Sequence, residues 1–203
     1  MSMFILASAS PRRSDILNQI GIEFKVIESN ADEEISDKCP PEKYVEILAE
    51  RKAEAVFNNI SKSEDEVVVI GADTIVVYGH EILGKPKDKK DAFNTLRKLQ
   101  GNKHSVYTGI SVFYKSDNGV VKKTNSDKTD VYMLPLTDGE ILNYIESEEP
   151  LDKAGSYAVQ GKGAVIIEKI DGDFYTVVGM SPSKLYKMLS SIGVKIKFQN
   201  DDK

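Results

Sequence analysis

Short apolar runs alternate with amphipathic segments in the first part of the chain, which predicts strands that alternate with helices. The runs at residues 3–7 and 22–27 have the length of strands, and residues 11–20 between them keep the helical spacing of apolar positions. Gly21 is a natural residue to end this helix because glycine accepts a left-handed backbone. The pattern therefore predicts a strand–helix–strand unit at the N-terminus.

A longer helix and a buried strand are predicted next. Residues 41–58 keep the period of a helix that places Lys52 just beside its buried face. The positions expected on that buried face are Tyr44, Ile47, Leu48 and Ala55. The run Val67–Ile70 is continuously apolar, as is typical of a strand covered on both faces. Because the polar residue Asp73 interrupts the apolar pattern soon afterwards, it is expected at a strand end or a bulge.

The middle of the chain predicts a hairpin with a helix on each side. Residues 104–114 and 120–133 are expected to form an antiparallel pair. A helix is expected over residues 88–100, and Thr137 and Glu140 have the spacing of a capping box that begins another.

The last part of the chain predicts a second hairpin, a helix and a final strand. Residues 164–170 are expected to pair with residues 174–178 across a turn. A helix should begin at Pro182, and residues 194–198 are predicted to form a strand. The whole pattern predicts an α/β fold with a mixed, strongly twisted central sheet flanked by helices, in a single domain over residues 1–203.

Composition narrows the classes of partner. The 203 residues are 40% hydrophobic and 29% charged, which is typical of a globular protein with a full core. The formal net charge of −5 disfavours nucleic acid as a partner, because a polyanion would meet net repulsion. No segment has the length and hydropathy of a membrane span or a signal peptide, and Cys39 is the only cysteine. We expect a cytoplasmic protein that binds neither nucleic acid nor membrane.

The segment Ser8–Arg13 is the first candidate binding site. Ser10 suits the N-cap of the predicted helix and Pro11 its first position, so Arg12 and Arg13 fall on the first turn. A helix N-terminus presents unpaired N–H groups and a positive dipole end, which favour a bound phosphate. Taken alone, this segment leaves open an ordinary capped helix with two solvated arginines.

Two lysines and two acidic residues extend this candidate. Lys52 and Lys85 could each supply a cation to a phosphate, although a solvated lysine is the alternative for both. Asp73 lies within an apolar run, where its carboxylate would lose hydration. Either a cation or hydrogen bonds to nearby amides in a turn must compensate that loss. Mg²⁺ characteristically binds one or two carboxylates together with phosphate oxygens. For the acidic loop around Glu33, the alternative to a metal ligand is an ordinary solvated loop.

Seven segments, taken in order, point to a known family. They are Leu6–Arg13, Arg51–Ala53, Gly71–Val76, Gly84–Pro86, His104–Gly109, Asp152–Gly161 and Gly172–Gly179. Together they resemble the Maf family of nucleoside triphosphate pyrophosphatases, also described as septum-formation inhibitors, over nearly the whole chain. The resemblance implies an inosine-triphosphatase-like architecture with a cleft between two lobes. It also implies hydrolysis of a nucleoside triphosphate to the monophosphate and pyrophosphate.

The resemblance also implies roles for individual residues. The positions that match triphosphate-binding residues are Ser8, Arg12, Arg13, Lys52 and Lys85. Asp73 matches the family's catalytic acid/base, and Glu33 matches an acidic position that assists the metal or the attacking water. The implied catalytic set is therefore Asp73, Glu33, Lys52 and Lys85. The implied cofactor is a divalent cation, Mg²⁺ or Mn²⁺, held at Asp73 and Glu33.

Two segments imply the substrate. The branch of the family that acts on dTTP and UTP resembles this chain in the Pro-Arg-Arg run that ends at Arg13 and in the pair Gln160-Gly161. The branch that acts on 7-methyl-GTP carries a tryptophan in its first motif, and this chain contains none. Arg13, Thr74 and Gln160 match the positions linked with specificity. The implied substrates are dTTP and UTP, with modified pyrimidine triphosphates as further candidates.

Two alternatives remain. A nucleotide-sensing regulator of cell division would bind the same ligand with little or no turnover, and a purine triphosphatase of related architecture would differ in base recognition.

The run Gln100–His104 departs from the family's usual Ser-Gly-Arg and removes one cation. A homodimer is compatible with the resemblance, which is its only support.

Overall fold

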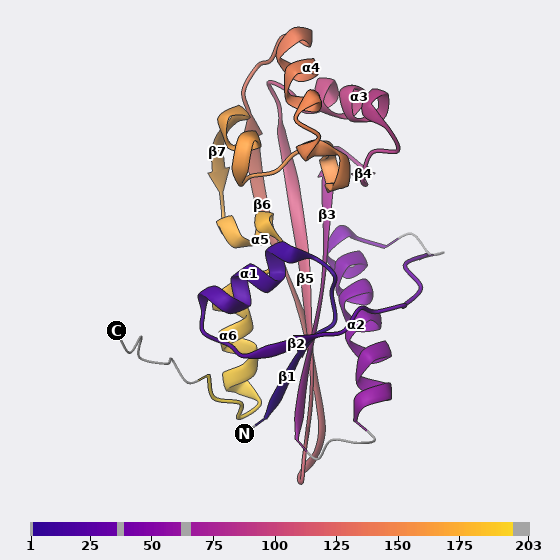
Figure 1. The fold of residues 1–203 in the computed structure, drawn as a ribbon, viewed down its shortest axis with the longest axis vertical. Helices are drawn as coiled ribbons and strands as arrows, with labels where there is room; N and C mark the ends of the chain where they lie inside the picture. The colour runs from indigo at the N-terminus through magenta and orange to yellow at the C-terminus, as the bar shows by residue number, and fades with distance from the viewer. Residues whose placement is uncertain (1, 36–38, 62–65, 197–203) are drawn as a thin grey trace. The chain divides into compact units, whose positions relative to one another are not determined.

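The computed structural model describes residues 2–35, 39–61 and 66–196, which form a 7-stranded mixed sheet with helices (Figure 1). The strands are β1 (Met3–Leu6), β2 (Phe24–Val26), β3 (Val67–Tyr78), β4 (Glu81–Leu83), β5 (Lys103–Ser116), β6 (Gly119–Met133) and β7 (Ile167–Asp171). The helices are α1 (Pro11–Gln19), α2 (Pro41–Ile60), α3 (Lys89–Leu99), α4 (Asp138–Glu146), α5 (Phe174–Val178) and α6 (Pro182–Ser191). Three 3-10 helices are η1 (Glu149–Asp152), η2 (Ala154–Ser156) and η3 (Gly161–Ile166). The predicted mixed sheet flanked by helices is confirmed.

The strand order is β2-β1-β3-β5-β6-β7, with β4 paired to β3. The chain divides into two compact units. The first unit comprises residues 1–73, 108–126 and 179–203, and the second comprises residues 74–107 and 127–178. The single domain expected over residues 1–203 stays a prediction.

In the first unit, β1 lies between two parallel neighbours, β2 and β3. Helix α1 joins β1 to β2, and α2 joins β2 to β3 on the far side of β1. Because such crossovers are right-handed, two that run in opposite directions place their helices on opposite faces of the sheet. Figure 1 shows this arrangement, with α2 on one face and α1 and α6 on the other.

Helix α2 begins at the predicted residue, but its buried face is not the predicted one. Its buried residues are Val45, Leu48, Ala49, Ala53, Val56 and Phe57, whereas Tyr44, Ile47 and Ala55 are only half-buried. The cause is a close approach to the sheet. A Cβ atom at Gly71 of β3 would lie 2.7 Å from the Ala53 amide nitrogen, and one at Gly109 of β5 would lie 2.9 Å from the Glu46 amide nitrogen. Ala49 and Ala53 of α2 therefore face Gly71, and the backbone of Val45 and Glu46 faces Gly109.

The prediction for Asp73 was a strand end or a bulge. Strand β3 continues through Asp73, so the strand end is not found, and the bulge stays a prediction. Its residues are buried from Val67 to Asp73, and Lys52 of α2 contacts the Asp73 carboxylate. A polar residue can remain inside a covered strand when an opposite charge compensates its lost hydration.

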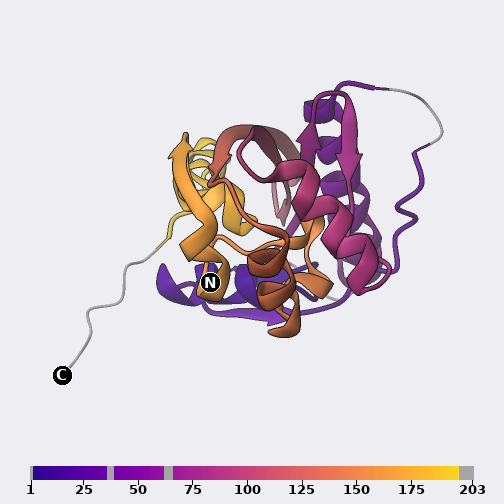
Figure 2. The same cartoon turned by 90° about the horizontal axis from the view of Figure 1, so that it is seen from above.

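In the second unit, α3 and α4 lie side by side over a hydrophobic core (Figures 1 and 2). The predicted capping box is confirmed at the start of α4. The Thr137 hydroxyl accepts the Glu140 amide, and the Glu140 carboxylate accepts the Thr137 amide. These reciprocal bonds satisfy two of the four N–H groups that a helix start leaves unpaired.

The second predicted hairpin is wrong. Strand β7 pairs with β6, and residues 174–178 form the short helix α5 instead of a partner strand. The Asp173 carboxylate accepts the Tyr175 amide at 3.0 Å, and this capping bond favours a helical turn. At the end of the described chain, residues 194–196 are not in a strand, and residues 197 and 198 lie outside the described residues.

Candidate active site

Two predicted site residues of the first unit follow the carboxyl ends of parallel strands, and a third, Asp73, lies within β3 beyond the level at which β1 ends. Strand β1 ends at Leu6, and Ser8 comes two residues later. Leu6 is paired with Ile70 of β3, so Asp73 lies three residues beyond that level. Glu33 lies in the loop that follows β2. Ligand sites in open parallel sheets characteristically form at this edge.

Arg13 is a buried guanidinium rather than a solvated one. Its Nε donates to the Gly179 carbonyl at 3.0 Å, and its Nη1 donates to the Ser8 hydroxyl at 2.9 Å. Burial lowers the pKa of Arg13, while the charge of Asp73 opposes that change. Arg12 next to it is half-buried. Arg13 therefore fixes the shape of the segment before α1, which contains Ser8.

The Lys52 ammonium joins two carboxylates. Its Nζ lies 2.6 Å from Asp73 Oδ1 and 2.8 Å from Glu33 Oε1. The Lys52 and Asp73 side chains are 15% and 12% exposed, and the Glu33 side chain is 65% exposed. The inner pair is therefore shielded from water and the outer carboxylate is not. Strand alternation explains the contact, because Asp73 lies on the same face of β3 as Gly71, and that face packs against α2.

Arg51 is a residue whose role sequence reasoning missed. Its Nη1 donates to the Asp32 carbonyl at 3.1 Å and to the Glu34 carbonyl at 2.7 Å. These bonds hold the acidic loop against α2 on both sides of Glu33. The Arg51-Lys52 pair was part of the family resemblance, but contacts to main-chain carbonyls 17 and 19 residues away leave no local pattern.

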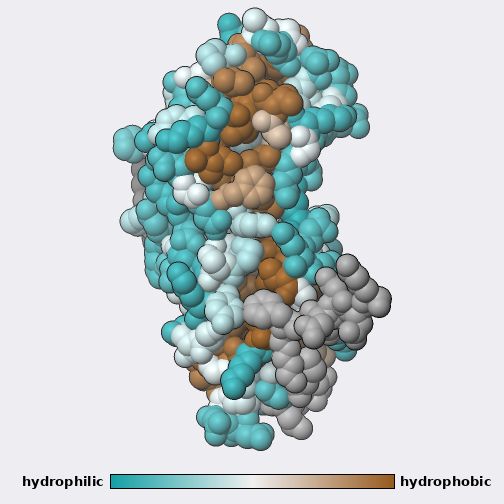
Figure 3. Space-filling view, turned by 90° about the vertical axis from the view of Figure 1, so that its left-hand side faces the viewer, coloured by the Kyte–Doolittle hydropathy of each residue, from teal (hydrophilic) through white to brown (hydrophobic). Residues whose placement is uncertain are grey.

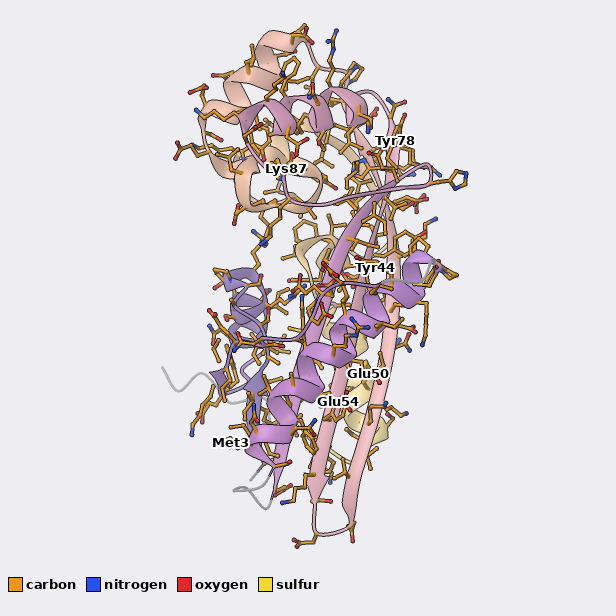
Figure 4. All side chains as sticks on the ribbon, turned by 90° about the vertical axis from the view of Figure 1, so that its right-hand side faces the viewer. Met3, Tyr44, Glu50, Glu54, Tyr78 and Lys87 are labelled. Atoms are coloured by element: carbon orange, nitrogen blue, oxygen red, sulfur yellow. The ribbon has the colours of Figure 1, made fainter. Side chains whose placement is uncertain are left out.

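Tyr44 also belongs to this cluster, although the helical pattern placed it in the core. It lies at the N-terminal end of α2 (Figure 4) and is half-buried. Burial raises the pKa of the Tyr44 phenol, and the negative charges of Asp73 and Glu33 raise it further, while Lys52 opposes them. The hydroxyl therefore stays protonated at neutral pH and can donate a hydrogen bond.

The remaining predicted residues lie in the second unit. Thr74 is half-buried in β3, and Lys85 is exposed just after β4. The Gly84 carbonyl before Lys85 accepts the Gly155 amide at 3.1 Å, which ties this turn to η2. Gln160 is exposed at the N-cap of η3, and no described residue forms a hydrogen bond with its side chain. That these three complete a site with the residues of the first unit stays a prediction.

Asp73 and Glu33 are the expected ligands of a divalent cation. Within residues 2–35, 39–61 and 66–196, no group of three or more His, Cys, Asp or Glu side chains is placed to hold an ion. Asp73 and Glu33 contact the same ammonium, so both can present an oxygen to one cation. Two carboxylates with phosphate oxygens are the donors that Mg²⁺ prefers. The residues therefore fit a metal that arrives with a phosphate ligand.

A pocket of about 330 Å³ lies elsewhere, in the second unit. Its lining includes Leu134, Leu136, Tyr144, Lys162 and Val165, and none of the predicted site residues. Hydrophobic side chains gather in the upper part of the surface in Figure 3. Leu134 and Val165 of the pocket lining are exposed. Among the described residues, no helix has the length and hydropathy needed to cross a bilayer.

Comparison with known proteins agrees with the motifs. The family model described as "Maf-like protein" matches residues 3–192. A dTTP/UTP pyrophosphatase of Thermoanaerobacter sp. is 48% identical over 185 residues, which are 91% of this chain and 94% of that protein. One from Caldicellulosiruptor saccharolyticus is 44% identical over 193 residues, 95% of this chain and 96% of that protein.

Among solved structures, the Staphylococcus aureus Ham1 protein covers 92% of this chain and 90% of its own, with 14% identity and a TM-score of 0.43. Nothing about function follows from a likeness at that level. The evidence for the family is the family model, which spans nearly the whole chain, and the relatives of 44% and 48% identity. This chain belongs to the Maf-like protein family.

Proposed function

We propose that this protein is a nucleoside triphosphate pyrophosphatase that hydrolyses dTTP and UTP to the nucleoside monophosphate and pyrophosphate. Support comes from the names of its relatives, which align over more than nine-tenths of the chain. The observation that carries the proposal is the partly buried contact of Lys52 with Asp73, with Glu33 on the outer side. The Lys52 ammonium lies between a shielded and an exposed carboxylate, beside the carboxyl end of β1. This arrangement is suited to binding a phosphate group and orienting a water molecule.

The reaction requires water to attack the α-phosphate. A bond forms between the water oxygen and the α-phosphorus, the bridging bond to the β-phosphate breaks, and pyrophosphate leaves. Asp73 orients the water and accepts its proton, while Lys52 holds the carboxylate in place. Negative charge grows on the phosphate oxygens during this step, so prepositioned cations supply most of the stabilisation. Lys52, Arg12 and Lys85 are the proposed cations, and Arg13 keeps Ser8 in position to bind the phosphates.

A divalent cation completes the proposed chemistry. Asp73 and Glu33 would hold Mg²⁺ or Mn²⁺ together with the phosphates. When bound, the ion neutralises phosphate charge. The exposed Glu33 side chain can move away from Lys52 to meet the ion, since its loop is held through main-chain carbonyls rather than through this carboxylate.

Gln160 is the residue proposed to recognise the base by hydrogen bonding. A side-chain amide can both donate to and accept from the edge of a pyrimidine. Its side chain is exposed and forms no hydrogen bond with any residue in the described part of the chain, so it is available to a ligand. Thr74 and Arg13 are the other proposed specificity residues, and Arg13 acts through the backbone that it holds.

The test is pyrophosphate release across a panel of nucleotides with Mg²⁺ or Mn²⁺. We expect turnover of dTTP and UTP and much slower turnover of ATP and GTP. Turnover of inosine or 7-methyl-guanosine triphosphate with none of dTTP and UTP would contradict the substrate assignment. Tight binding of dTTP without release of pyrophosphate would instead support a nucleotide-sensing regulator.

A further inference from the structure

Glu149, at the start of η1, is the centre of a hydrogen-bond network in the second unit. Its carboxylate accepts three bonds: from the Tyr144 hydroxyl at 2.8 Å, from the Lys162 amide at 2.9 Å and from the Gly163 amide at 2.8 Å. The Tyr144 oxygen in turn accepts the Ala158 amide at 3.1 Å. Two side chains thus bind main-chain groups at both ends of the loop over residues 158–163.

The glycines of this loop are explained by the same two side chains. Gly161 has a φ of +76°, and a Cβ atom there would lie 2.6 Å from Glu149 Oε2. A Cβ atom at Gly163 would lie 2.5 Å from the Tyr144 hydroxyl oxygen. Only residues without a side chain let the loop close so tightly around Glu149 and Tyr144. The glycine of the Gln160-Gly161 pair is therefore favoured by its left-handed backbone, and its lack of a side chain leaves room for the Glu149 carboxylate.

Gln160 lies within this anchored loop. The backbone is held on one side at Ala158 and on the other at Lys162 and Gly163, while the Gln160 side chain is exposed. A fixed backbone that carries an available amide is suited to recognition, since little freedom is lost when the ligand binds.

We propose that Glu149, with Tyr144, is a specificity-determining positioning residue that holds the loop in the conformation in which Gln160 reads the base. This inference rests on the proposed function. Glu149 contacts the loop and not the substrate, so its effect is exerted through Gln160.

The charge state of Glu149 agrees with this role. Burial raises its pKa, but the bonds from Lys162 and Gly163, the Tyr144 hydroxyl and the charge of Lys153 lower it by more, so that the pKa lies below its ordinary value of 4.5. At neutral pH the carboxylate is ionised and only accepts hydrogen bonds, which matches the three donors around it.

The test compares Glu149→Gln and Tyr144→Phe with the wild type and with Glu146→Gln as matched control. Glu146 also carries a carboxylate, at the end of α4, but its side chain is 69% exposed and pairs with Lys89. Gln at position 149 keeps the size of the side chain but presents an NH₂ group to main-chain donors. Tyr144→Phe removes only a hydroxyl and keeps the proposal testable if Glu149→Gln fails to fold.

The first readout is amide hydrogen exchange at Lys162 and Gly163. We expect exchange to be about tenfold faster or more in Glu149→Gln and unchanged in Glu146→Gln, because a charge-assisted hydrogen bond is lost. The second readout is the ratio of kcat/KM for UTP to that for CTP or ATP, which share its ribose and triphosphate. We expect this ratio to fall about tenfold in Glu149→Gln and to change little in the control.

Faster exchange with an unchanged substrate ratio would overturn the proposal, since Glu149 would then hold the loop without affecting base choice. Unchanged exchange would overturn it equally. If the wild type hydrolyses no nucleotide, the proposed function fails, and the same ratio is then measured from equilibrium binding of UTP, CTP and ATP. A lower binding ratio in Glu149→Gln would still support the positioning role, and an unchanged one would refute it.

Discussion

Gly71→Ala should damage the proposed active site without touching any charged residue. The new methyl group would lie 2.7 Å from the Ala53 amide nitrogen and 2.9 Å from the Ala53 Cβ, and closer still to the Ala49 carbonyl. Ordinary contacts are 3.4 Å or more, and the Ala49 carbonyl, as the closest atom, sets the displacement, so α2 must shift away from β3 by about 1 Å. The neighbouring residue Lys52 would shift with it, and its 2.6 Å contact with Asp73 would exceed the length of a good hydrogen bond.

The expected magnitudes follow from this shift. Overpacking of this kind costs about 1–3 kcal/mol, which lowers the Tm of a chain of this size by roughly 2–12 °C. Displacement of a catalytic group by nearly 1 Å reduces kcat by about 10- to 100-fold. Thermal unfolding and pyrophosphate release from dTTP measure the two effects.

A matched control separates the shift from the added methyl group. Gly139→Ala introduces the same group near the start of α4, where the nearest atom, the Thr137 hydroxyl oxygen, is 4.0 Å away. This variant should keep wild-type kcat and gain slightly in helix stability. If Gly71→Ala keeps both wild-type kcat and wild-type Tm, the close approach of α2 does not position Lys52, and the reasoning is refuted.

Two further predictions concern buried ionisable groups. Arg13→Lys keeps the charge but cannot donate simultaneously to the Ser8 hydroxyl and the Gly179 carbonyl as the guanidinium does. Tm should therefore fall and KM for dTTP should rise about tenfold. Unchanged values would show that these two hydrogen bonds are dispensable. Burial lowers the pKa of His104 from 6.5 to about 4, so the unfolded chain takes up a proton before the folded one does. The contribution of His104 to the free energy of unfolding should therefore be fully present above pH 6.5 and decline by a few kcal/mol as the pH falls to about 4. The His104→Gln variant should lose less free energy of unfolding over this range, and an equal loss in both proteins would contradict the assignment.

Local signals were sufficient for much of the fold. The helical period located α2, and the capping box at Thr137 located α4, since both depend on residues within a few positions of each other. The continuity of β3 could not be predicted this way. Asp73 looks like a strand end unless Lys52, 21 residues earlier in the chain, is known to lie beside it.

The same limit applies to the candidate site. The motifs pointed to Ser8, Lys52 and Asp73 as candidate site residues because a family resemblance preserves their order along the chain. The positioning roles of Arg51 and Glu149 depend on bonds to main-chain groups in other segments, and such bonds impose no residue type on their partners. These roles became visible only when the contacts were known.

Comparison of Asp73→Asn with the wild type tests the central claim most directly. Asparagine has nearly the same shape but cannot accept the proton of the attacking water. With dTTP and Mg²⁺, pyrophosphate release by Asp73→Asn should fall at least about 10³-fold, while the Kd for dTTP changes by less than about tenfold. Near-normal pyrophosphate release by Asp73→Asn would contradict the account, because the carboxylate held by Lys52 would then have no part in the reaction.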